Sequence, residues 1–80
     1  MNIKQLKPVH IGYLMVDGDR VGEIFECTHP YDEGRCAYLG LQHETKRVVL
    51  VNELRHMDRA WEEAFDQGRP VACLLGGPIS

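Results

Sequence analysis

A short apolar run followed by a helical pattern, over residues 48–68, most constrains the fold of this 80-residue chain. The run Val48–Val51 consists of four apolar residues, as is typical of a buried or half-buried strand. Apolar residues then recur at helical spacing until Gly68, and Pro70 follows. Glycine just after a helix and proline beyond it are stop signals. One strand and one helix are therefore predicted.

We expect the helix to span Glu53 to Gln67 with Asn52 as its N-cap, because an Asn side-chain oxygen accepts a free first-turn amide. An alternative interpretation extends the strand to Leu54 and begins the helix after Asp58, which is also a suitable N-cap. One stripe of the helix is apolar and is expected to face a sheet. It consists of Leu54, Met57, Ala60, Trp61, Ala64 and Phe65.

Apolar alternation predicts a strand at Val9–Val16 and a second at Val21–Cys27, joined by a turn at residues 17–20. A two-residue Asp-Gly turn and a three-residue connection give different registers for this hairpin, and the sequence leaves both open. Thr28 to Arg35 is predicted to be a long loop, because Pro30 and Gly34 interrupt regular structure. The other expected strands are 36–42, 47–51 and 71–75.

These elements predict an α+β fold, β-β-β-β-α-β in sequence, with an antiparallel sheet and one amphipathic helix packed on one face. Eighty residues favour a single domain over 1–80, in which residues 1–8 form a loosely held lead-in and residues 76–80 a flexible tail. The apolar fraction of 44% and the charged fraction of 26% are those of a globular protein. No apolar stretch has the length of a leader or a membrane span, so a cytoplasmic protein is expected.

The chemistry-bearing residues match no catalytic or metal-binding motif. Three cysteines cannot all pair within one chain, although Cys27 and Cys36 could meet across the predicted loop. No two of the cysteines have the close spacing of a structural zinc site, and the four histidines are spread over separate elements. We therefore expect no metal, no cofactor and no enzymatic activity.

The net charge of -3 disfavours direct nucleic-acid binding, which depends on Lys and Arg neutralising phosphates. Residues 17–35 are the acidic part, with six acids against two bases. An exposed tyrosine flanked by carboxylates is a plausible protein-contact group, because tyrosine offers rigid amphipathic area and carboxylates steer toward basic surfaces. The candidate partner-binding residues are Asp17, Asp19, Tyr31, Asp32, Glu33 and Arg35. The simpler interpretation is a solvated acidic loop that keeps the protein soluble.

In its small size, acidity and lack of catalytic motifs, the chain resembles the anti-CRISPR inhibitors carried by phages and mobile elements. The resemblance implies a protein that docks on a basic surface of a nucleic-acid-binding complex and blocks DNA access. The alternative is a structural or regulatory subunit that self-associates through a strand edge, such as the final strand or the lead-in. Both a monomer and a homodimer fit the sequence.

Overall fold

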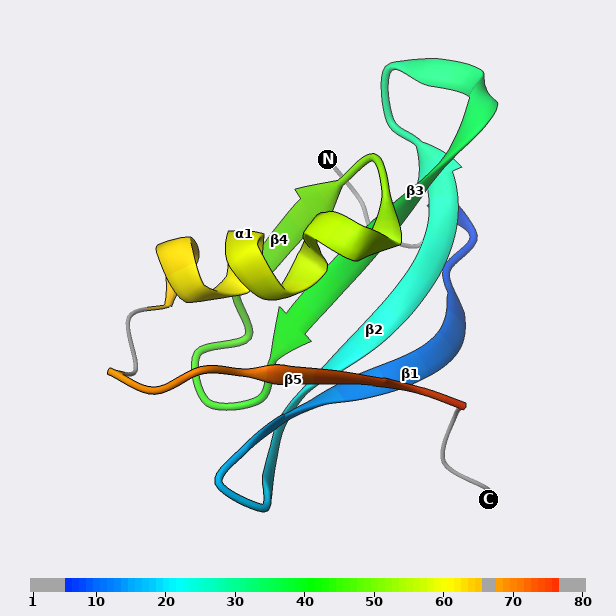
Figure 1. The fold of residues 1–80 in the computed structure, drawn as a ribbon. Coiled ribbons are helices and arrows are strands. Elements are labelled where there is room, and N and C mark those ends of the chain that lie inside the picture. Colours follow the sequence, from blue (N-terminus) through cyan, green and yellow to red (C-terminus); the bar gives the residue numbers. More distant parts are fainter. Residues whose placement is uncertain (1–5, 66–67, 77–80) are drawn as a thin grey trace.

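The computed structural model describes residues 6–65 and 68–76. It confirms the predicted α+β fold, a five-stranded antiparallel sheet of order β4-β3-β2-β1-β5 with one short helix (Figure 1). The elements are β1 (Val9–Val16), β2 (Asp19–His29), β3 (Asp32–Gln42), β4 (Val48–Val51), the 3-10 turn η2 (Leu54–His56), α1 (Met57–Ala64) and β5 (Ala72–Leu75).

The helix lies on one face of the sheet, because the chain must cross from β4 at one edge to β5 at the other (Figure 1). Met57 and Trp61 point into this face and are fully buried. They pack with Leu14 and Ile24 from the two central strands. The opposite face, here called the open face, carries a smaller cluster of Leu6, Cys27, Ala37 and Leu39.

The first turn of the predicted helix is a 3-10 turn, and the α-helix proper is short. It begins at Met57 after η2, and Asn52 does not cap it, because the Asn52 side chain instead bonds to His29. It ends at Ala64, because Phe65 leaves the helical conformation and packs edge-on against Trp61, with ring centroids 4.6 Å apart. The predicted Asn52 cap and the alternative start after Asp58 are therefore wrong, whereas η2 and α1 together form a helical segment that begins at Leu54, one residue after the predicted Glu53. The predicted end at Gln67 lies outside the described residues.

The β1–β2 hairpin has the two-residue Asp17-Gly18 turn, with Val16 opposite Asp19. Neither regular register persists along it, because two bulges interrupt the ladder. Met15 pairs with Arg20 but Leu14 pairs with Gly22, so Val21 is the extra residue of the first bulge. The second bulge restores the original register beyond Gly12.

The long loop predicted at Thr28 to Arg35 is a second hairpin. Strand β2 continues to His29 and β3 begins at Asp32, so only Pro30 and Tyr31 connect them. Polar residues are compatible with strands here because this part of the hairpin is solvated on both sides. The polar residues that predicted a loop therefore lie in a hairpin that projects from the sheet.

The end of the predicted lead-in packs against the open face, since Leu6 is only 7% exposed and contacts the cluster there. At the other terminus, the Gly76 N–H donates to the Ile11 carbonyl and extends the β1–β5 ladder. Residues 1–5 of the predicted lead-in and 77–80 of the predicted tail lie outside the described residues.

Candidate functional site

The β2–β3 hairpin extends beyond both of its neighbours (Figure 1). Strand β1 pairs with β2 only as far as Glu26, and β4 pairs with β3 only as far as Tyr38. Beyond those positions, within the part of the chain that the structure describes, the two strands pair only with each other. The far end, residues 29–35, is here called the hairpin tip, and it carries the aromatic side chain of Tyr31, which is 84% exposed.

His29 fixes the conformation of the hairpin tip. The Tyr31 backbone N–H donates to His29 Nδ1 at 3.1 Å, which leaves the imidazole proton on Nε2. That nitrogen donates to Asn52 Oδ1, also at 3.1 Å, and so ties the tip to the segment after β4. The Tyr31 ring packs edge-on against the His29 ring, with centroids 6.2 Å apart. Tyr31 is therefore exposed but held in place.

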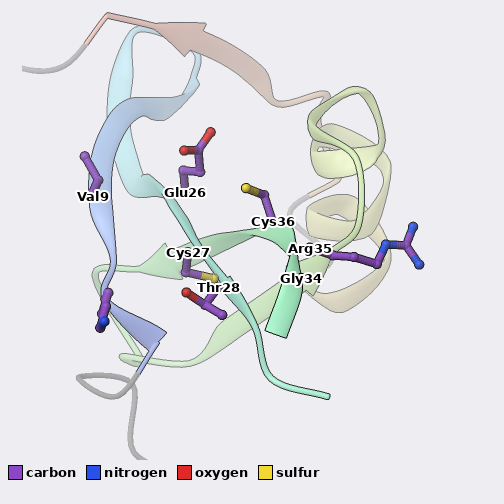
Figure 2. A pocket seen from close by; sticks show the side chains of 8 residues that line it. Val9, Glu26, Cys27, Thr28, Gly34, Arg35 and Cys36 are labelled. Carbon is purple, nitrogen blue, oxygen red and sulfur yellow. The ribbon is translucent and has the colours of Figure 1, made fainter. Parts of the chain in front are cut away.

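Asp32 lies beside Tyr31 and is exposed, with Oδ1 accepting the Gly34 N–H at 3.3 Å. Arg35 is exposed as well, and Figure 2 shows its side chain pointing away from Val9 and Glu26. The structure thus groups three of the predicted contact residues, Tyr31, Asp32 and Arg35. Glu33 lies between them in the chain.

Asp17 and Asp19 do not join this group. They lie at the opposite end of β2 (Figure 1), and eleven residues of strand separate the two ends by roughly 35 Å at about 3.3 Å per residue. Asp17 also forms an ion pair with Arg69, which offsets its charge. The single acidic surface expected from the sequence is therefore two surfaces, of which only the hairpin tip carries an exposed aromatic residue.

Sequence reasoning missed a polar cluster on the open face, centred on Glu23. His10 Nε2 lies 2.6 Å from Glu23 Oε1, and His43 Nε2 lies 2.6 Å from Oε2. Arg20 donates to both oxygens, from Nε at 2.8 Å and from Nη2 at 2.5 Å. We call these four residues the Glu23 cluster. Predicting it requires the register of the β1–β2 hairpin, which the sequence leaves open.

Burial raises the pKa of Glu23, but the hydrogen bonds from Arg20, His10 and His43 outweigh it and hold the pKa at about 2. The carboxylate is therefore ionised at neutral pH and accepts on both oxygens. Such a group is a poor general base. Its geometry instead joins β1, β2 and the turn after β3.

The open face also has an apolar part next to the β4 edge. A small cavity of about 100 Å³ is lined by Pro8, Phe25, Leu39, Leu41 and Val48. Val48 and Leu50 point to this face and are 40% and 39% exposed. This surface is too shallow to enclose a ligand of ordinary size.

A second hollow of about 240 Å³ lies at the base of the hairpin (Figure 2), where Cys27 and Cys36 contribute to the lining. Both thiols are free. Cys27 shares the open face with its partner Ala37, so Cys36, one residue before Ala37, points to the other face. Because a disulfide needs converging Cβ atoms, this geometry keeps the two apart. Burial raises the pKa of the Cys27 thiol.

Within residues 6–65 and 68–76, no three His, Cys, Asp or Glu side chains are placed to hold a metal ion. Over the same residues, no helix has the length and apolar character needed to cross a membrane. No known protein family, curated protein or solved structure matches the chain. Any function must therefore be argued from the surfaces described above.

Proposed function

We propose that this protein is a non-enzymatic binding module that docks on a Lys/Arg-rich protein surface through its hairpin tip. The observation that supports this most is Tyr31, whose ring is 84% exposed at the end of a ribbon that projects beyond its neighbouring strands. A large aromatic side chain at a convex tip fits into a pocket of a partner. Tyrosine is among the residues that contribute most to interface energy.

The bonds of His29 support the proposal energetically. Binding costs roughly 0.5–1.5 kcal/mol for each rotamer-rich side chain that it immobilises. Tyr31 has few rotatable bonds, and its backbone is already fixed by the bond to His29. Less conformational entropy is therefore lost when the hairpin tip docks.

Charge favours a basic partner. Asp32 takes part in no ion pair among the described residues. Glu33 is a second acidic residue next to Asp32 in the sequence, while the positive charge of Arg35 offsets one of the two negative charges. Unpaired surface carboxylates steer association toward Lys/Arg-rich surfaces and make it sensitive to salt.

We further propose that the partner is a nucleic-acid-binding complex whose DNA access is blocked. Surfaces rich in Lys and Arg are the ones that bind phosphates. A projecting tip that occupies part of such a surface excludes DNA from it by steric obstruction. A net charge of -3 is too small for a mimic of a whole DNA duplex, so contact at one protein site fits better.

The test is a comparison of three immobilised proteins in lysate of the source organism or its host. They are the wild type, the triple variant Y31A/D32A/E33A, and the control D58A/E62A, which removes the same number of acidic residues from exposed positions of α1. We expect the wild type and the control to capture the same basic protein, released by raised salt, and the triple variant to lose it. Capture of that protein at equal strength by the triple variant would overturn the assigned surface.

A further inference from the structure

The free edge of β4 lacks the features that usually protect an edge strand from pairing. Its sequence, Val48–Val51, holds four apolar residues, with no charge, proline or bulge of the kind that normally protects an edge. Among residues 6–65 and 68–76, no strand lies beyond it in the sheet order. Val48 and Leu50 are also among the exposed large apolar residues.

The hydrogen-bonding pattern shows which backbone groups this edge offers. The Gln42 N–H donates to the Arg47 carbonyl, so this carbonyl faces β3. Because consecutive residues of a strand alternate, Val49 and Val51 also face β3, whereas Val48 and Leu50 face outward. Leu50 therefore presents both a free donor and a free acceptor at the centre of the edge.

Charge around β4 is arranged for pairing with itself. Arg47 precedes the strand, with its guanidinium over the Phe65 ring on the helix side at 5.4 Å. Glu53 follows the strand in an extended conformation, with φ of -132° and ψ of 136°. When two antiparallel copies place Leu50 opposite Leu50, residue 47 of each lies opposite residue 53 of the other. Each Arg47 then meets Glu53 of the other copy, which exchanges its exposed ion pairs with Arg55 and His56 for this contact.

From this self-complementarity we infer that the protein forms a homodimer through β4, with Leu50 opposite Leu50 across a twofold axis perpendicular to the sheet. The two sheets join into one, both helices lie on the same side, and Val48 and Leu50 of both copies form one apolar stripe on the open face. The inference does not depend on the hairpin tip. It adds that antiparallel pairing directs the two tips to opposite ends of the joined sheet, so one dimer holds two partner molecules.

The β5 edge is also apolar, with Leu74 and Leu75 41% and 61% exposed, but it lacks opposite charges at its two ends. Arg69 precedes β5, and no acidic residue follows β5 up to Gly76. Self-pairing of β5 therefore brings no opposite charges together. This comparison assigns the dimer to β4 rather than to the final strand or the lead-in.

The test is sedimentation of the full chain over a wide concentration range, with far-UV circular dichroism to verify folding. The wild type is expected at twice the monomer mass. Each single change R47E or E53R places like charges opposite each other at two positions and is expected to raise the dimer dissociation constant roughly tenfold. The double variant R47E/E53R restores the pairing and should return the constant to near the wild-type value.

Leu50→Lys places two ammonium groups side by side on the axis and should give a folded monomer, since Leu50 is 39% exposed and its backbone does not bond to β3. Leu75→Lys is the matched control at the β5 edge, where Leu75 is 61% exposed, and should leave the dimer intact. A wild type that is monomeric at every concentration would overturn the inference. So would a dimer unaffected by Leu50→Lys, or a double variant as weak as R47E.

Discussion

Arg20 and Glu23 lie on the same face of β2, three residues apart, because the bulge at Val21 shifts the alternation of the strand by one position. In a regular strand, residues separated by three point to opposite faces. The bulge therefore brings the guanidinium to a carboxylate that His10 and His43 also contact. A local irregularity of the backbone thus produces the densest polar contact in the described structure.

Replacing Glu23 with Gln is expected to lower the free energy of unfolding by about 2 kcal/mol at neutral pH. A pKa held at about 2, against about 4.5 in the unfolded chain, corresponds to roughly 3 kcal/mol, reduced because two of the partners are partly exposed. Urea denaturation of both proteins measures the difference.

The pH dependence follows from the same lowered pKa. Between about pH 4.5 and pH 2 the unfolded chain binds a proton at Glu23 that the folded protein does not. The stabilisation is therefore complete above this window and is lost as the pH falls through it. E23Q lacks this contribution, so the two stabilities should converge toward pH 2; a gap that stays constant with pH would contradict the assigned ionisation.

Gly22→Ala is expected to destabilise the fold by about 3 kcal/mol or more, because the added carbon cannot be accommodated in a close-packed core. It would lie 2.4 Å from Trp61 Cη2 and 2.6 Å from the Leu41 carbonyl. Gly34→Ala is the matched control, since the nearest atom there is 3.7 Å away. Thermal unfolding of the two variants should give a large loss for Gly22 and little change for Gly34.

The three thiols are expected to react at different rates. Burial, with the nearby charges of Asp58 and Glu62, raises the pKa of Cys73 to about 11, and burial also raises the pKa of Cys27. Because the thiolate is the reactive form, iodoacetamide should modify exposed Cys36 first. Mass spectrometry of partly alkylated protein measures the order, and rapid labelling of Cys27 in the folded protein would contradict its described burial.

Asn52→Ala is expected to loosen the hairpin tip without unfolding the protein. It removes the acceptor of His29 Nε2, a bond worth about 1 kcal/mol or less at an exposed site. Amide exchange at Tyr31 should become faster and partner binding weaker, while the melting temperature changes little. Arg55→Ala, an exposed change nearby, is the control; equal exchange rates in both variants would show that Asn52 does not hold the tip.

The strands of this fold follow from local pattern. Alternation gives the bounds of Val9–Val16 as the structure has them, and the stripe containing Met57 and Trp61 correctly indicates the buried side of the helix. The predicted N-cap is wrong because Asn52 bonds to His29, which lies 23 residues earlier in the chain. Composition alone cannot show whether the Asn52 side chain caps the nearby helix or bonds to a residue far away in the sequence.

The candidate site is less predictable for the same reason. Tyr31 and Asp32 are correctly predicted to be exposed, but the sequence does not show that Asp17 lies at the far end of the sheet. That separation depends on β2 continuing as a strand through Thr28 to His29. The Glu23 cluster depends on a bulge, and the β4 edge on sheet order, and both are set by tertiary pairing.

Hydrogen–deuterium exchange of the free protein and of its complex with the captured partner locates the docking surface directly. Exchange is expected to slow in residues 27–37, centred on the hairpin tip, and to stay unchanged at the exposed helix residues Asp58, Arg59 and Glu62. Protection confined to the helix or to the open face, with the hairpin exchanging as in the free protein, would contradict this docking surface.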